Sequence, residues 1–260
     1  MDFTIKQYTQ LLKALRSAGF FFQTFEEHLK APKKKTIVLR HDVDLLPENS
    51  LRFANIQNEM GIKGSYYFRT VPESWDEKII KEIAELGHEV GYHYETMDQV
   101  NEDSKDQHVD LAYVLFCKKL EQLRQIVHVS TICMHGSPRS KFDNKAIWEK
   151  YDYKKLGIIG EPYYDVDFDD VFYLTDTGRR WDGWKVSVRD KVPQQDKWVK
   201  QGLVFHSTQD IIKAVNENKL PDKIMMTFHP QRWHDSVFPW AKELIMQNAK
   251  NVIKKYFFVK

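Results

Sequence analysis

The sequence predicts a single α/β domain, a closed or nearly closed (β/α) barrel, with an open doubly wound sheet as the alternative topology. Short β-branched or aromatic runs alternate with helical stretches along most of the chain, a pattern typical of parallel strands joined by right-handed crossovers. The 260 residues suit one barrel of roughly 250 residues better than two ordinary domains. No proline-rich linker, repeat or sharp change in composition divides the chain. We therefore expect one domain over 1–260, with 1–30 as an N-terminal helical extension.

Each element is predicted from its residue pattern. Apolar residues at helical spacing predict a helix over roughly the first fifteen positions, and the apolar run TIVLR predicts the first strand at 36–40. Further strands are expected at 64–69, 88–94, 131–135, 156–159, 171–175, 203–205 and 223–228. Further helices are expected at 48–60, 76–86, 106–127, 144–151, 209–217 and 238–255. The segment 181–200, rich in Trp, Lys and Asp, is expected to form a long functional loop or an irregular strand pair.

Composition excludes several classes of protein. With 42% hydrophobic residues the chain can bury a core, and 39 basic against 37 acidic residues give no basic excess for general nucleic-acid binding. No run of about 18 to 20 apolar residues and no signal-peptide pattern is present, so we expect a cytoplasmic protein without a membrane span. Cys117 and Cys133 form no CxxC pair and are expected to be reduced thiols. No glycine-rich phosphate loop follows the first strand, and the oligomeric state is not predicted.

Histidines, carboxylates and arginines gather where the expected strands end. They are His41-Asp42-Val43-Asp44, Arg69, His93-Tyr94-Glu95, His135, Asp176 with Arg179 to Asp182, and His229. Because the carboxyl ends of parallel strands meet on one rim, we expect these side chains to form one site. Asp42 and Asp44, two residues apart, can point to the same side, as can His93 and Glu95. This composition indicates a divalent-metal site with acid and base groups beside it.

Structural roles remain as alternatives for several of these groups. The HDVD segment at 41–44 is also compatible with a loop that is ion-paired to Arg40. His135 and His229 are equally compatible with burial against a backbone carbonyl. His88 is expected to be structural rather than catalytic. The acidic cluster at 165–170 is expected to be a solvated loop, with a second cation site as the alternative.

Three motifs resemble those of the polysaccharide deacetylase family, also called the NodB-homology or carbohydrate esterase family 4-like family. They are LRHDVD at 39–44, GHEVGYH at 87–93 and MMTFHP at 225–230. The resemblance implies a distorted (β/α) barrel of the NodB type that removes N- or O-acyl groups from sugars with a divalent metal. It also implies that one of Asp42 and Asp44 is the base and the other a ligand, that His93 is a ligand, and that His229 is catalytic. We take Asp42 as the base and Asp44 as the ligand.

The chain departs from the family pattern at its second metal histidine. That position, four residues after His93, is Met97, whose thioether is a poor ligand for zinc. We therefore expect Glu95 or His135 to complete the ligand set. The departure indicates a divergent branch of the family. The expected metal is zinc, with cobalt, nickel or manganese as alternatives.

The resemblance also implies roles for residues around the metal. An aspartate would accept the proton of the attacking water, and His229, held by Asp176 or Asp182, would protonate the leaving group. Apart from the resemblance, Arg179 and Arg180 are expected either to orient the base by pairing with a carboxylate or to bind a substrate phosphate. Arg69, Trp181, Asp182 and Trp184 are expected to bind the sugar.

These observations predict a metal-dependent deacylase acting on an acylated sugar or a polysaccharide precursor. Two alternatives remain at the level of sequence. One is a metal-free glycoside hydrolase that uses paired carboxylates such as Asp42 and Glu95. The other is a noncatalytic carbohydrate-binding barrel that has lost its metal, an alternative that Met97 favours.

Overall fold

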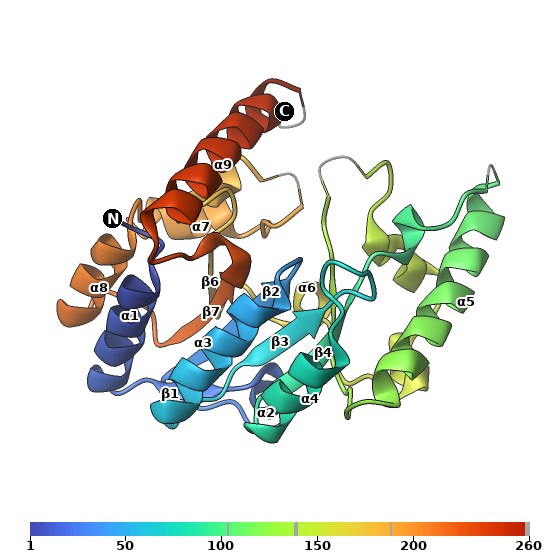
Figure 1. Cartoon of the computed structure of the whole chain (residues 1–260), viewed down its shortest axis with the longest axis horizontal. Helices are drawn as coiled ribbons and strands as arrows, with labels where there is room; N and C mark the ends of the chain where they lie inside the picture. The colour runs from blue at the N-terminus through green and yellow to red at the C-terminus, as the bar shows by residue number, and fades with distance from the viewer. Residues whose placement is uncertain (103, 138–139, 188, 258–260) are drawn as a thin grey trace.

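The computed structural model describes residues 1–102, 104–137, 140–187 and 189–257. Its strands form one curled, entirely parallel sheet in the order β5-β4-β3-β2-β7-β6, with β1 beside β2 (Figure 1). The strands are β1 (Phe21–Gln23), β2 (Thr36–Val43), β3 (Ser65–Phe68), β4 (Glu89–Tyr94), β5 (Ile132–Met134), β6 (Phe172–Thr175) and β7 (Lys223–Phe228). The predicted single α/β domain with a distorted (β/α) barrel is confirmed.

The barrel is open on one side. Among the described residues, β5 and β6 lie at the two ends of the sheet and do not pair with each other. Beyond β5, a single parallel bridge joins Thr131 to Gly160, and the amide of Ile159 donates to the carbonyl of Ser130. The strand predicted at 156–159 is therefore reduced to this bridge. This bridge extends the sheet beyond β5 but does not close the barrel.

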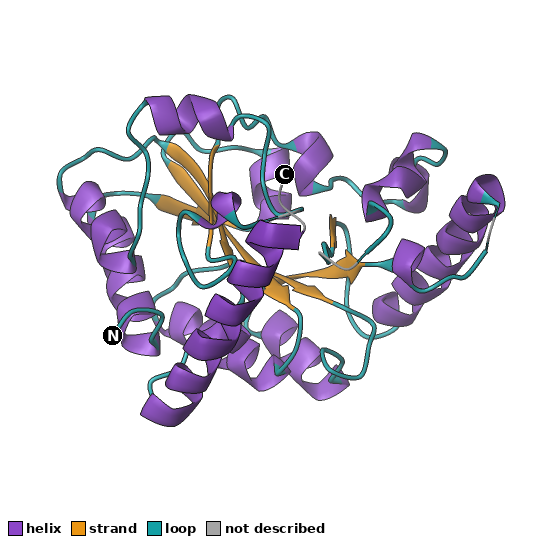
Figure 2. Ribbon diagram, turned by 90° about the horizontal axis from the view of Figure 1, so that it is seen from above, coloured by secondary structure: helices purple, strands orange, loops and turns teal. Residues whose placement is uncertain are grey.

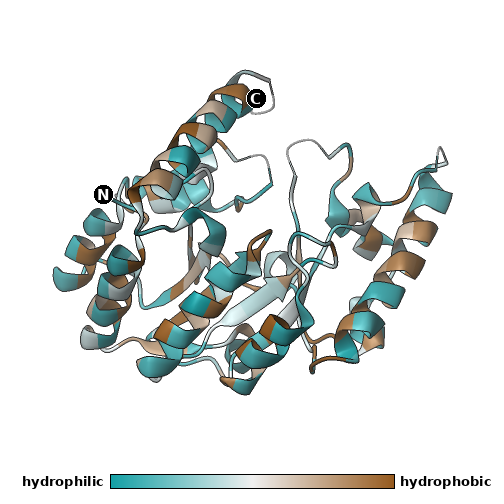
Figure 3. Cartoon of the chain, viewed as in Figure 1, coloured by the Kyte–Doolittle hydropathy of each residue, from teal (hydrophilic) through white to brown (hydrophobic). Residues whose placement is uncertain are grey.

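Helices cover the outside of the sheet, as the view from above shows (Figure 2). The longer ones are α1 (Ile5–Ser17), α3 (Pro47–Glu59), α4 (Glu77–Glu85), α5 (Lys105–Arg124), α8 (Thr208–Asn216) and α9 (Val237–Phe257). Shorter helices are α2 (Phe25–Lys30), α6 (Pro162–Asp165) and α7 (Gln195–Lys200), and 3-10 turns are η1 (Thr96–Asp98), η2 (Asn144–Glu149), η3 (Tyr153–Leu156), η4 (Gly183–Lys185) and η5 (Pro230–Arg232). Polar and apolar residues alternate along the outer helices (Figure 3), as expected for helices with one buried face. Among the described residues, no helix is both long and apolar enough to cross a membrane.

The N-terminal segment is more than a helical extension, which corrects the expectation for 1–30. Residues 21–23 form strand β1 and pair with 36–38 of β2. Helix α2 then follows beneath the sheet, where the amide of Phe25 donates to Ser65 and the amide of Glu26 to Glu89. A three-residue strand is too short to show a period of two, so the sequence pattern did not predict it. The predicted strand at 203–205 does not form, and the helix predicted at 144–151 is the 3-10 turn η2.

Strand β2 runs three residues further than predicted, so the HDV segment belongs to the strand. Side chains along it alternate between two environments. His41 lies outside the sheet, 3.2 Å from the hydroxyl of Tyr8 on α1. Arg40 and Asp42 lie inside, where they pair with each other. This alternation turns Arg40, Asp42 and Asp44 toward the barrel interior and removes His41 from any site there.

Candidate metal centre and active site

Asp44, His93 and His135 converge at the carboxyl-terminal rim. Asp44 follows β2, His93 lies near the end of β4, and His135 directly follows β5. The Nε2 atoms of His93 and His135 each lie 3.6 Å from Oδ1 of Asp44. One potential ligand atom from each residue lies within 4.8 Å of the other two. The structure thus brings together three of the four predicted metal ligands.

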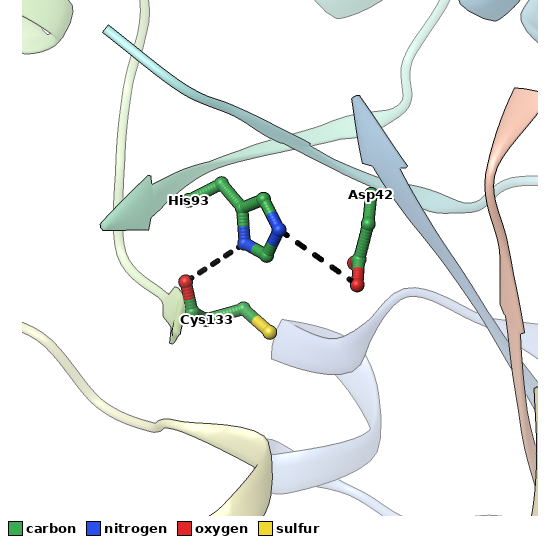
Figure 4. A group of neighbouring side chains, drawn as sticks. All are labelled: Asp42, His93 and Cys133. Atoms are coloured by element: carbon green, nitrogen blue, oxygen red, sulfur yellow. Dashed lines mark hydrogen bonds and ion pairs between the residues drawn. The ribbon is translucent and has the colours of Figure 1, made fainter. Parts of the chain in front are cut away.

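The second ring nitrogen of each histidine lies within 3.0 Å of an oxygen atom. Nδ1 of His93 lies 3.0 Å from the backbone carbonyl of Cys133, to which it donates (Figure 4). Nδ1 of His135 lies 2.9 Å from Oε2 of Glu95. Contacts of this kind fix the ring orientation and leave Nε2 free, as is usual for metal-binding histidines. Oδ1 of Asp44 is buried and accepts no hydrogen bond from the described residues. Two free imidazole nitrogens and one unpartnered carboxylate oxygen fit a divalent cation such as zinc.

Electrostatics favour the charged form of Asp44. Burial raises the pKa of this carboxyl, but the imidazoles of His93, His135 and His229 outweigh it and hold the pKa well below its usual range. A deprotonated carboxylate is the form that binds a metal.

Glu95 lies behind His135 rather than beside Asp44. Arg69 donates to both of its carboxylate oxygens, at 3.0 and 2.9 Å. Burial raises the pKa of Glu95, but His135 and Arg69 outweigh it and lower the pKa to about 2. The structure therefore corrects the expectation for this residue, because Glu95 orients His135 instead of joining the triad. Arg69 is bound to Glu95 and to the carbonyl of Asp44, which leaves it a positioning role rather than the predicted contact with sugar.

Met97 is not among the residues that line the cavity at the centre. Its side chain is buried in a small apolar cluster with Val109 and Ala112 of α5 and with Ile147. The second imidazole beside Asp44 is that of His135, which follows the neighbouring strand β5.

Asp42 is held by Arg40 through two hydrogen bonds of 3.0 and 2.9 Å. Its Oδ2 lies 3.8 Å from Nε2 of His93 (Figure 4). The fully buried Arg40 also lies 3.5 Å from Asp190, which accepts hydrogen bonds from Thr175 and Tyr163. This carboxylate–guanidinium–carboxylate chain fixes the orientation of Asp42 beside the triad.

Asp42, His93 and Cys133 also lie close enough to share an ion (Figure 4). Burial raises the pKa of the Cys133 thiol well above its usual value, so the sulfur stays protonated. The carboxylate of Asp42 is already engaged by Arg40. This second group therefore does not fit a metal as well as Asp44, His93 and His135 do.

His229 at the end of β7 is held by Asp176. Its Nδ1 lies 2.5 Å from Oδ1 of Asp176, and its Nε2 lies 3.9 Å from Oδ2 of Asp44. Arg232 and the indole of Trp233 also donate to Asp176. Burial raises the pKa of Asp176, but His229 and Arg232 outweigh it and lower the pKa. A charged carboxylate therefore lies behind the imidazole, as the sequence predicted for Asp176.

The other predicted residues of the 179–184 segment lie away from the centre. Arg179 stacks on Trp240 of α9 and donates to its carbonyl, so it does not orient Asp42. Trp181 is only 2% exposed and donates to Thr208, which leaves no free face for a sugar. Asp182 pairs with Arg180 and Lys185, and Trp184 lies under Lys185. The backbone turns directly after β6, where Gly178 and Arg179 have φ of +71° and +58°. After this turn the chain carries the 179–184 segment away from the rim.

Three cavities meet at the centre. The central one, of about 60 Å³, is lined by the triad, Asp42 and His229. A cavity of about 580 Å³ shares His135 with it. A third, of about 370 Å³, shares Asp44 and Arg232 with it. The centre therefore lies between two larger spaces on the rim.

Comparison with known proteins gives only distant similarity. No family model matches the chain, and no curated protein matches it. A carbohydrate esterase family 4 pseudoenzyme from Bacillus anthracis is 15% identical, with 87% of this chain and 63% of that chain covered and a TM-score of 0.43. A Streptococcus pyogenes deacetylase solved with acetate is 18% identical, with 56% and 68% covered and a TM-score of 0.42. The catalytic domain of a peptidoglycan N-acetylglucosamine deacetylase from Eubacterium rectale is 16% identical, with 84% and 86% covered and a TM-score of 0.42.

These matched structures include proteins of the family whose motifs the sequence resembles. The chain spans about 63% of the length of the pseudoenzyme. Since every one of these TM-scores is below 0.5, we draw the function from the geometry of the centre alone.

Proposed function

We propose that the chain is a metal-dependent deacylase that removes an N- or O-acyl group from a sugar. The observation that carries this proposal is the convergence of two imidazole Nε2 atoms, those of His93 and His135, on the unpartnered Oδ1 of Asp44. Three protein ligands leave a coordination position for water or substrate, as in catalytic zinc sites. When bound, the cation supplies a Lewis acid that polarises the acyl carbonyl and lowers the pKa of water toward about 7.

Asp42 is the base in this proposal. It lies beside the triad without belonging to it, and the two hydrogen bonds from Arg40 hold its carboxylate in one orientation. A carboxylate in this position accepts the proton of the water that attacks the acyl carbon. Arg40, with Asp190 behind it, is a positioning residue.

His229 is the acid that protonates the leaving group. Its Nδ1 is engaged by Asp176, so its Nε2 is the nitrogen that faces the centre. The buried carboxylate of Asp176 holds the imidazole ring in this orientation, as in other Asp–His pairs. When the acyl C–N or C–O bond breaks, the Nε2 proton passes to the departing amine or alcohol, and the acyl group leaves as a carboxylate.

The shape of the rim is compatible with an acylated sugar. The central cavity of about 60 Å³ has room for a small acyl group, and the flanking cavities of about 580 and 370 Å³ have room for sugar rings. The glycoside hydrolase alternative is weakened, because Arg69 and His135 bind Glu95, which is one of the two carboxylates that it requires. That mechanism needs two carboxyl groups that both face the scissile bond.

A matched pair of variants tests the proposal. Metal content is measured on purified protein reconstituted with zinc, and acetate release is measured with N-acetylglucosamine oligomers. We expect one divalent ion per chain in the wild type, its loss in His135→Asn, and its retention in Met97→Leu, because Met97 lies in an apolar cluster. Acetate release is expected to follow metal content.

Two results contradict the proposal. A wild type that binds no metal after reconstitution favours the noncatalytic carbohydrate-binding barrel. Sugar hydrolysis that survives chelation favours the glycoside hydrolase.

A further inference from the structure

Helix α9 crosses the rim of the sheet, as the view from above shows (Figure 2). Two lysines of this helix and one arginine of η5 line the cavities there. Lys254 and Arg232 line the central cavity together with the metal triad. Arg232 and Lys250 line the neighbouring cavity of about 370 Å³. Cations of the two cavities therefore lie together on the α9 side of the centre, next to the carboxylates Asp42, Asp44 and Asp190 of the central cavity.

Only one of these charges has a carboxylate partner in the described part of the chain, because Nη1 of Arg232 lies 3.3 Å from Oδ1 of Asp176. Among the described residues, no carboxylate lies within ion-pairing distance of the Lys254 or Lys250 ammonium. Arg232 is 8% exposed, and although its Nη1 donates to Asp176, its buried Nε has no acceptor in the described chain. A buried donor without a partner costs free energy that a bound acceptor would recover.

The surrounding charges support the same conclusion. Burial, together with the charges of Arg232 and Lys250, lowers the pKa of Lys254 to about 8, while Asp190 and Asp44 raise it. Of these two carboxylates, Asp190 lies 3.5 Å from Arg40, and Asp44 is a ligand of the proposed metal centre. The third cavity also contains Lys242, His234 and Glu243. Its lining thus has three cations (Arg232, Lys242 and Lys250) and two carboxylates (Asp44 and Glu243), so cations outnumber carboxylates there.

We propose that the acylated sugar carries a phosphate group and that Lys254, Arg232 and Lys250 bind this phosphate beside the metal centre. The identity of the sugar rests on the proposed function. A phosphate carries more negative charge than a carboxylate and offers three acceptor oxygens, so several cations can bind it at once. Lysine and arginine are the usual phosphate-binding side chains.

The opposite side of the centre has a different charge. The cavity of about 580 Å³ contains Glu95, Asp98 and Glu102, together with Arg69, which Glu95 already binds, and Lys141. This difference orients the substrate, with the phosphate toward α9 and the acyl group in the central cavity.

The test is a binding comparison on the zinc-loaded full chain by isothermal titration calorimetry. The probes are N-acetylglucosamine 1-phosphate, neutral N-acetylglucosamine and the carboxylated N-acetylmuramic acid. We expect the phosphorylated sugar to bind about tenfold more tightly than the neutral one. Lys254→Gln should lose most of this preference, and Lys250→Gln part of it. Lys255→Gln makes the same charge change on the same helix at an exposed residue, so it should keep the preference.

Three results would overturn the inference: equal binding of the neutral and phosphorylated sugars, equal effects of Lys254→Gln and Lys255→Gln, or N-acetylmuramic acid binding as tightly as the phosphate. Phosphate that binds the zinc directly does so equally in both variants, so their difference reports on the lysine. Acetate release is measured in parallel. If no sugar is deacetylated but the binding contrast holds, the proposed function fails and the phosphate site stands. If acetate is released without the contrast, only the phosphate site fails.

Discussion

Asp42 and Asp44 lie two residues apart, face the same interior and have different partners. Arg40 binds Asp42 through two hydrogen bonds, whereas Asp44 faces the imidazoles of His93 and His135. Sequence spacing predicted that both carboxylates point inward, but it left open which one is the base. The partners separate the roles, because a carboxylate held by a guanidinium is a poorer metal ligand than one that faces two free nitrogens.

Two single variants should therefore behave differently. In Asp42→Asn we expect acetate release to fall by about 10²- to 10⁴-fold while the zinc content stays unchanged, because the variant removes only the base. In Asp44→Asn we expect the zinc itself to be lost. Elemental analysis and a deacetylation assay on both variants check this. Equal zinc loss in the two variants would contradict the assignment.

Arg40 should also matter for stability. It is fully buried and bound to Asp42, so Arg40→Met leaves an uncompensated buried carboxylate. We expect the free energy of unfolding to fall by about 3–5 kcal/mol in urea denaturation. Arg52→Met is the control, because the Arg52–Asp235 pair is exposed and should contribute less than about 1 kcal/mol. Similar losses in the two variants would show that the buried pair has no special role.

His41 and His88, which are buried between the sheet and its outer helices, predict that the stability of the fold depends on pH. Burial lowers the pKa of His41 from 6.5 to about 3 and that of His88 to about 4. Below pH 6.5 the unfolded chain binds protons that the folded chain does not, so stability falls as the pH falls from 6.5 toward these values. Each histidine contributes a slope of about 1.4 kcal/mol per pH unit.

Replacement of His41 should reduce this slope. We expect His41→Asn to show a smaller loss of unfolding free energy between pH 6.5 and 4.5 than the wild type, even if it is less stable at every pH. His128 is exposed, so His128→Asn should retain the wild-type slope. Urea unfolding at several pH values measures both. An unchanged slope in His41→Asn would show that His41 is not neutral in the folded protein.

At the scale of elements, the strands that carry the centre were predicted well, because apolar runs and terminal glycines mark their bounds. The strand at 223–228 forms at the predicted residues, and β4 begins one residue later than expected. The path after β6 was not predictable, because the positive φ of Arg179 is an exception to the behaviour of non-glycine residues. The expected positions of Arg179, Trp181, Asp182 and Trp184 depended on that path.

Gly91 in β4 makes the close approach of two strands possible. A Cβ atom at this position would lie 2.4 Å from the ring of Tyr67 on β3 and 3.0 Å from the carbonyl of Thr131. We expect Gly91→Ala to reduce the free energy of unfolding by about 1–3 kcal/mol, because the buried ring has no space to move into. Adding Tyr67→Leu should restore part of the loss, and urea denaturation of the single and double variants measures the coupling. Strictly additive losses would contradict the steric explanation.

At the scale of the molecule, local patterns predicted the parallel α/β architecture and the rim on which the site lies. They offered the pairing of Arg40 with the HDVD segment only as a structural alternative to a site, and they did not predict Asp190 and Lys254 at the central cavity. The last two come from a loop and from the C-terminal helix, far from the motifs along the chain. No periodicity links such residues, since only the tertiary fold brings them to one cavity. The role of His135 in place of the missing histidine was predictable as one of two options, and the fold favours it over Glu95.

The proposed metal centre would link the middle of the sheet to its open edge, and this predicts a local effect of metal removal. Asp44 follows the central strand β2, whereas His135 follows β5, which lies at one end of the sheet. Zinc at a hundredfold excess over its dissociation constant should add about 2.7 kcal/mol to the free energy of unfolding. Chelation should therefore accelerate amide hydrogen exchange most in β5 and in residues 158–160, which lie at the edge of the sheet that His135 would tie to the metal. The acceleration should be least in β6 and β7, which carry none of the three proposed ligands. His135→Asn should show the fast exchange with or without zinc, whereas Met97→Leu should respond as the wild type does. Equal acceleration throughout the sheet would mean that the cation does not hold β5 to the centre.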